Sequence, residues 1–149
     1  MDIKKFYDDN GYYFPIDAIE NTKIDKAYEK LIKLYQNPPK NINHPWNLQA
    51  HLLANWIHEL CISPLLLDAV ENVIGPNILI QSADIFIKPA MGKNHINWHQ
   101  DANYWGLNPY ELVTGWIALT DVHLDNGCMN YLPKSHLKNK IEHIETFDK

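Results

Sequence analysis

The sequence predicts an α+β protein in which helices come first and strands follow. Before Gly75, apolar residues recur every three or four positions, which is the period of an amphipathic helix. After Gly75, the chain is rich in β-branched residues separated by turn-forming residues, which is typical of strands. This segregation of helices from strands indicates the α+β class. A length of 149 residues is enough for one domain.

Two helices are expected at the start of the helical region, residues 1–75. The first covers residues 2–9 and ends at Asn10-Gly11, because glycine favours the left-handed backbone that closes helices. The second follows the apolar spacing of residues 24–35. Pro38-Pro39 must end it, because proline lacks the amide hydrogen that a helix needs.

Two further helices complete this region. The first is marked by apolar residues at helical spacing: Leu48, Leu52, Trp56 and Leu60. The second is the segment PLLLDAVENVI, residues 64–74. Ser63 and Pro64 have the residue types of a helix N-cap and first helical position, and Gly75 closes the helix.

Residues 76–137 are expected to form the strands of the domain, and residues 138–149 a polar tail. The strand candidates are residues 77–89, 95–105, 112–124 and 128–133. Asp125-Asn126-Gly127 predicts the turn before the last of them. A closed barrel or jelly roll needs about eight strands, so the sequence predicts a single, truncated domain.

Composition and charge exclude several classes of protein. The 13 basic residues, all Lys, against 18 acidic ones give a net charge of −5, so nothing indicates a nucleic-acid-binding surface. No apolar run approaches the roughly 18 residues of a membrane span, and the charged start lacks the apolar segment of a signal peptide. Cys61 and Cys128 lack metal-pair spacing and stand in apolar surroundings. We therefore expect a reduced, cytoplasmic protein without nucleic-acid or membrane partners.

Residues 98–101, Trp-His-Gln-Asp, carry the strongest candidate for chemistry. Residues two apart on a strand project from one face, so His99 and Asp101 are expected to approach one ion. Such a pair, joined by a distant second histidine, makes the facial triad of non-haem Fe(II) oxygenases. A second His-x-Asp, at His123, is discounted because its Asp125 runs into a turn, where Asp is favoured for backbone hydrogen bonding.

Several spaced sequence blocks follow one another between Lys88 and His136. They are I-K-P, a Gly-containing loop, W-H-Q-D-A-N-Y-W, V-T-G-W-I-A-L-T-D and N-G-C-M-x-x-L-P-K-S-H. This order strongly resembles the phytanoyl-CoA dioxygenase family of Fe(II)/2-oxoglutarate-dependent oxygenases. The likeness covers residues 47–137, with a looser one in D-D-N-G-Y-Y-F-P-I. It implies that the strands belong to a double-stranded β-helix core of the jelly-roll or cupin type.

The resemblance also implies a reaction. His99 and Asp101 fall on the first two iron ligands of the family, in which 2-oxoglutarate is the cosubstrate. The family uses dioxygen to oxidise its substrate while 2-oxoglutarate is decarboxylated to succinate. A carboxylate at Asp101, where related halogenases have a small apolar residue, favours hydroxylation. The substrate is expected to be a small molecule or an acyl thioester.

The resemblance assigns four further residues around this pair. Lys88 lies on the strand that carries cosubstrate-contacting groups and is expected to hold a carboxylate of 2-oxoglutarate as a point charge. Trp116 falls where the family has a pocket-wall tryptophan near the cosubstrate. Tyr104 and Trp105 flank the metal motif and are expected to line a mostly apolar substrate pocket.

Two parts of the family's site are not expected in this chain. The distal histidine and the arginine that grips 2-oxoglutarate belong beyond residue 149, and the chain contains no Arg. We therefore expect an N-terminal part of a dioxygenase that is inactive by itself. One alternative is a catalytically inactive remnant or binding domain of the same fold. Another is a cupin-like metal protein such as an isomerase, although only His99 and His95 are available for its usual cluster of histidines.

Overall fold

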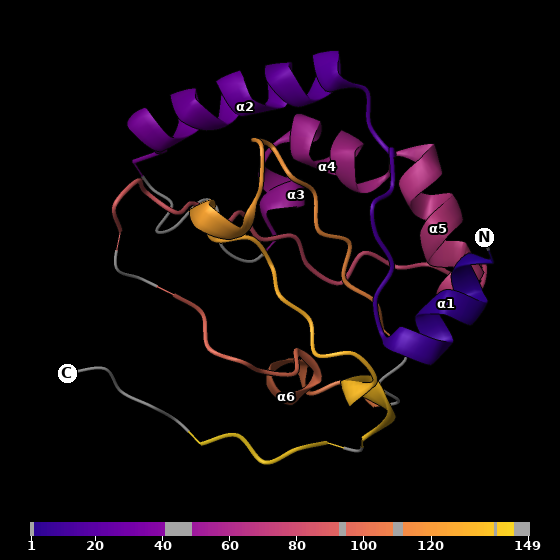
Figure 1. The fold of residues 1–149 in the computed structure, drawn as a ribbon. Helices are drawn as coiled ribbons and strands as arrows, with labels where there is room; N and C mark the ends of the chain where they lie inside the picture. Colours follow the sequence, from indigo (N-terminus) through magenta and orange to yellow (C-terminus); the bar gives the residue numbers. More distant parts are fainter. Residues whose placement is uncertain (1, 41–48, 93–94, 109–111, 139, 145–149) are drawn as a thin grey trace.

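The computed structural model of the protein describes residues 2–40, 49–92, 95–108, 112–138 and 140–144. Within these residues it contains six α-helices and two short 3-10 helices. Figure 1 shows α2 crossing one side of the molecule, with α3 and α4 beneath it and α1 beside α5. Irregular chain connects this helical layer to α6, which lies apart from the other helices (Figure 1).

The first helix, α1, spans Ile3–Asn10 and agrees with the helix predicted for residues 2–9. Its N-terminus is capped by the Asp2 carboxylate, which accepts a hydrogen bond from the Lys5 amide at 3.0 Å. Gly11 ends it in the left-handed conformation, with φ 85°, and donates its amide hydrogen to the Tyr7 carbonyl. The predicted Asn10-Gly11 stop signal is confirmed.

The second helix, α2, spans Asn21–Gln36 and ends before Pro38-Pro39, as the sequence predicts. Its inward face buries Ala27 and Leu31, four residues apart. The remaining surface is polar or only partly covered, so a single apolar stripe fixes this helix against the rest of the molecule.

The single helix predicted from Leu48 to Leu60 is wrong in the described residues, where two helices follow each other. They are α3, Ala50–Leu53, and α4, Asn55–Cys61, separated by Ala54 in an extended conformation with φ −144° and ψ 120°. The Ala50 amide donates to the Ala83 carbonyl at 2.9 Å, which fastens the start of α3 to a distant segment. Helical spacing alone cannot reveal such a long-range constraint.

Helix α5 spans Pro64–Ile74 and confirms the helix predicted there, with Gly75 at its end and φ 83°. The Ser63 side chain does not cap it. Instead, the Ser63 hydroxyl donates to the Ala18 carbonyl at 2.6 Å and ties the start of α5 to the segment between α1 and α2.

The strands predicted for residues 76–137 are absent from the described part of the chain. Residues 77–89 and 112–122 run as irregular chain, and residues 102–105 form the short helix α6, Ala102–Trp105. A strand exists only when a neighbour completes its ladder of hydrogen bonds, and alternating apolar residues supply a face but no partner. The predicted turn is confirmed as the 3-10 helix η1, Leu124–Asn126, followed by Gly127 with φ 84°.

The buried apolar core of the described residues is small and entirely helical. Its members are Ala27, Leu31, Ala50, Ile57 and Ala69. Large apolar side chains on the irregular segments are exposed, including Leu79 at 87% and Phe86 at 65%. Among the helices described, none has both the length and the apolar character needed to cross a lipid bilayer.

Candidate metal centre

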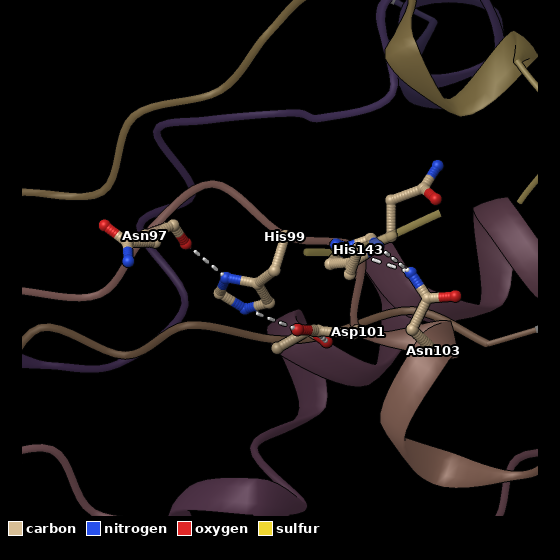
Figure 2. A network of polar contacts seen from close by, with 7 residues as sticks. Asn97, His99, Asp101, Asn103 and His143 are labelled. Atoms are coloured by element: carbon tan, nitrogen blue, oxygen red, sulfur yellow. Dashed lines mark hydrogen bonds and ion pairs between the residues drawn. The ribbon is translucent and has the colours of Figure 1, made fainter. Parts of the chain in front are cut away.

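The predicted metal motif lies on a bend rather than on a strand. The chain bends at Trp98, and Asp101 already has a helical backbone, with φ −53° and ψ −39°, at the start of α6. The prediction that His99 and Asp101 share one face of a strand is therefore wrong. Even so, the bend followed by the first turn of α6 directs both side chains to the same place, with His99 Nε2 3.2 Å from Asp101 Oδ1 (Figure 2).

The His99 ring is held by a backbone carbonyl on its other side. His99 Nδ1 lies 2.7 Å from the Asn97 carbonyl oxygen, which can only accept a hydrogen bond (Figure 2). Nδ1 must therefore carry a proton. In the neutral imidazole, Nε2 then has a lone pair that points at the carboxylate. Two acceptors 3.2 Å apart repel each other, so this arrangement calls for a cation, either a proton or a metal ion, between them.

The two oxygens of the Asp101 carboxylate face different neighbours. Oδ1 faces His99, while Oδ2 accepts a hydrogen bond of 2.8 Å from the Thr114 hydroxyl. Thr114 belongs to the V-T-G-W block, and the sequence assigns it no role of its own. The side chains of His99 and Asp101 are 32% and 39% exposed, so an ion from solvent can reach them.

The donor set suits part of a metal site. Two atoms about 2.0–2.2 Å from one metal ion, at an angle of about 90–100°, lie about 2.8–3.4 Å apart. The 3.2 Å between His99 Nε2 and Asp101 Oδ1 falls within this range. No cluster of three or more His, Cys, Asp or Glu side chains that could hold a metal occurs within the described ranges. Among the described residues, His99 and Asp101 therefore bring together two donor atoms of the kinds that bind metal ions.

A histidine that the sequence did not assign lies next to this pair. The His143 ring accepts a hydrogen bond from the Gln100 amide at Nε2, at 2.8 Å, and it also contacts the side chain of Asn103 (Figure 2). The Tyr104 ring lies edge-on to both imidazoles, 5.9 Å from His99 and 6.0 Å from His143. Tyr104 therefore packs against the rings of both histidines. The sequence predicts only a polar tail for the segment around His143.

The Asp101 carboxylate contributes to a raised pKa at two tyrosines. Burial, followed by the Asp101 carboxylate, raises the pKa of the Tyr131 phenol. Burial also raises the pKa of Tyr7, with smaller contributions from Tyr131 and Asp101. The Tyr131 ring stacks on Tyr12 at 5.2 Å. Both phenols were missed because no local sequence pattern links residues at the two ends of the chain.

The other predicted site residues are Lys88, Trp116 and Trp105. Lys88 Nζ donates to the Gly127 carbonyl at 2.6 Å, in the turn after η1. Trp116 is 42% exposed. Trp105 is half-buried at the end of α6, one residue after Tyr104.

Two other histidines have partners of their own. His123 is exposed and takes part in the cap of η1, with its Nδ1 3.9 Å from Asp125 Oδ2. His136 donates from Nε2 to the Asp8 carbonyl at 2.8 Å and so attaches η2, Ser135–Leu137, to α1. His95 is exposed.

Comparison with known proteins gives a consistent result. Mouse peroxisomal phytanoyl-CoA dioxygenase is 24% identical over 159 residues, which cover 91% of this chain and 47% of the mouse protein. A probable alpha-ketoglutarate-dependent hypophosphite dioxygenase from Stutzerimonas stutzeri is 30% identical over 122 residues, covering 78% of this chain and 37% of that protein. Bovine phytanoyl-CoA dioxygenase domain-containing protein 1 is 42% identical over 60 residues, covering 40% of this chain and 20% of that protein.

The chain spans about half the length of the mouse relative and less of the other two. No solved structure gives a significant match. A family model described as phytanoyl-CoA dioxygenase matches residues 7–149, nearly the whole chain. The chain therefore belongs to the phytanoyl-CoA dioxygenase family.

Proposed function

We propose that this chain carries the first part of an Fe(II)/2-oxoglutarate-dependent dioxygenase site, with His99 and Asp101 as two iron ligands. The observation that carries the proposal is the distance of 3.2 Å between His99 Nε2 and Asp101 Oδ1. The proton on His99 Nδ1 is donated to the Asn97 carbonyl, which leaves Nε2 as the nitrogen that faces the carboxylate. When bound, iron with 2-oxoglutarate supplies the oxygen-activating chemistry that no protein side chain provides. The reaction is hydroxylation of a small-molecule or acyl substrate.

Lys88 and Trp116 are proposed to contact 2-oxoglutarate. In support, Lys88 is exposed and its ammonium group is bound only to a neutral backbone carbonyl in the described contacts. A carboxylate carries a full negative charge, so it attracts the ammonium more strongly than a neutral carbonyl does and would displace it. Tyr104 and Trp105, on α6 directly after the ligands, are proposed to line the substrate pocket.

The irregular segments 77–89 and 112–122 are proposed to be strands of a double-stranded β-helix once they pair with complementary strands. Family membership supports this, together with the alternating β-branched residues of both segments.

The cellular compartment is predicted separately from the reaction. The sequence predicts a cytoplasmic protein, whereas the name of the mouse relative assigns that relative to the peroxisome.

Metal titration tests the proposed ligands. Co(II) replaces Fe(II) as a probe because its visible absorption reports its ligands and it does not oxidise in air. His99→Ala and Asp101→Ala should each weaken Co(II) binding at least about 10-fold. His123→Ala, which removes an exposed imidazole of the second His-x-Asp, should leave binding unchanged. Equal affinity of His99→Ala and the unmodified chain would refute the proposed ligands.

A catalytically inactive binding domain of the same fold is the second candidate. It is favoured by the described residues, which bring together two metal ligands and no third. Incubation of the purified chain with Fe(II), ascorbate and 2-oxoglutarate tests whether this chain by itself turns over 2-oxoglutarate. We expect no succinate above the free-iron background. Succinate formation that His99→Ala abolishes would mean that the chain completes the site by itself.

A further inference from the structure

We propose that His143 is a positioning residue for the His99–Asp101 pair: its ring fixes the peptide of Gln100, the residue between the two ligands. The inference rests on the proposed function, in which that pair binds a metal ion. It assigns a role to the segment 140–144, which comes from a distant part of the sequence and lies directly against the metal motif (Figure 2).

Gln100 is anchored to this segment by both its backbone and its side chain. The Gln100 amide donates to His143 Nε2 at 2.8 Å. The Gln100 side-chain oxygen accepts from the Ile141 amide at 2.9 Å. These two bonds span 43 and 41 residues of sequence, so they hold two otherwise independent segments in one register.

The peptide that His143 holds lies between the two ligands. The peptide unit of Gln100 is planar and includes the Cα of His99, so fixing the direction of its N–H restricts how the His99 side chain can project. Asp101 is the next residue and starts the turn of α6. Fixing this one peptide therefore restrains the relative direction of both metal-binding side chains.

The tautomer of His143 suits this role. The Gln100 amide can only donate, so His143 Nε2 is the acceptor and, in the neutral ring, Nδ1 carries the proton. The Ile141 carbonyl oxygen lies 2.8 Å from Nδ1 and accepts it. The side-chain amide of Asn103, on α6, lies against the same edge of the ring, with its nitrogen 2.6 Å from Nδ1 and 3.1 Å from Nε2, so the ring contacts both the peptide before α6 and the helix itself.

The Tyr104 ring provides a second connection. It stands edge-on to His143 at 6.0 Å with an interplanar angle of 85°, and edge-on to His99 at 5.9 Å with an angle of 70°. Edge-to-face contacts of this kind favour one ring orientation. The aromatic ring therefore rests against the ligand imidazole on one side and the positioning imidazole on the other.

Two substitutions of His143 distinguish the effect of its hydrogen-bond acceptor from the effect of its size. His143→Leu removes the acceptor while filling similar space. His143→Gln keeps an amide oxygen that can accept the Gln100 N–H. His95→Leu is the matched control, because it removes an exposed imidazole close to the motif in sequence. Two readouts are taken on the full chain: Co(II) affinity, with the metal alone as probe, and hydrogen exchange of the Gln100 amide by ¹⁵N NMR without metal.

His143→Leu should weaken Co(II) binding about 10–100-fold, the range for residues that orient metal ligands, and should remove the exchange protection of the Gln100 amide. His143→Gln should restore both, and His95→Leu should change neither. Loss of protection with unchanged Co(II) affinity would overturn the positioning role while leaving the proposed ligands intact. If the unmodified chain and His99→Ala bind Co(II) equally, the proposed function fails, and the positioning role fails with it.

Discussion

The two oxygens of the Asp101 carboxylate have different partners, and this difference gives a prediction at the scale of one residue. Thr114 donates to Oδ2 at 2.8 Å and leaves Oδ1 directed at His99. Thr114→Val removes the hydroxyl at nearly constant volume. Because the carboxylate is then free to rotate, we expect Co(II) affinity to fall about 10-fold.

Thr114→Ser keeps the hydroxyl and serves as the control for this substitution. It should retain the affinity of the unmodified chain. Unchanged affinity of the Val variant would mean that the hydrogen bond from Thr114 to Asp101 does not support metal binding.

Tyr131 gives a second prediction at this scale, concerning pH. Burial and the Asp101 carboxylate raise the pKa of its phenol, so the neutral phenol is favoured in the fold. Its contribution to stability is fully present below the pKa of an unfolded tyrosine, about 10, and is lost as the pH rises from that value through the higher pKa of the folded protein. We expect the Tyr131 phenolate, measured as the 295 nm difference between the unmodified chain and Tyr131→Phe, to form at higher pH than free tyrosine. A midpoint at or below that of free tyrosine would contradict the effect of burial.

Helix α1 gives the prediction at the scale of an element. Gly11 ends α1 with φ 85°, and a Cβ placed there would overlap the ring of His136, which attaches η2 to α1. Gly11→Ala therefore combines left-handed strain with a steric conflict. We expect it to lower the free energy of unfolding by at least about 2 kcal/mol, measured by urea unfolding followed through the helical circular dichroism signal.

Gly106, at the end of α6, is the matched control for this substitution. It also has a positive φ, 60°, but a Cβ there would meet nothing within 4 Å. In Gly106→Ala the only cost is the left-handed backbone of a non-glycine residue, so the free energy of unfolding should fall by about 1–2 kcal/mol. Equal losses at the two positions would mean that η2 does not pack on α1 in solution.

The extended segments show why element prediction succeeded for helices and failed for strands. A helix closes its hydrogen bonds within one stretch of chain, so periodicity and end signals suffice, as they did for α1, α2 and α5. The helix predicted across residues 48–60 is interrupted at the extended Ala54, and the Ala50 amide at the start of α3 bonds to the distant Ala83 carbonyl. The strands of residues 77–89 and 112–122 depend on partners that the described residues do not supply.

The surface area of the whole molecule is large for its mass. A monomer of 17.4 kDa is expected to expose about 7,900 Å², whereas this chain exposes 12189 Å². The excess is comparable to the area buried in an obligate protein interface, about 2,000–5,000 Å². Because large apolar side chains on the irregular segments, such as Leu79 and Phe86, are exposed, we predict that the isolated chain self-associates, measured by size-exclusion chromatography with light scattering.

Charge substitutions locate the associating surface. Leu79→Lys with Phe86→Lys, on the irregular segment, should reduce the associated mass, because buried lysines oppose pairing between chains. Leu52→Lys, at a side chain 72% exposed on helix α3, should not. A sharp monomer peak with cooperative thermal unfolding of the unmodified chain would contradict the prediction.

The family, the positions of α1, α2 and α5 and the approach of His99 to Asp101 could be predicted from the sequence, because each depends on local spacing or on an ordered series of motifs. Tertiary structure decided how that pair is held. Asn97 fixes the ring of His99, while Thr114 and His143 come from segments distant in sequence. Hydrogen bonds across 13 and 43 residues depend on how the chain folds back on itself, and no local pattern of residues encodes that path.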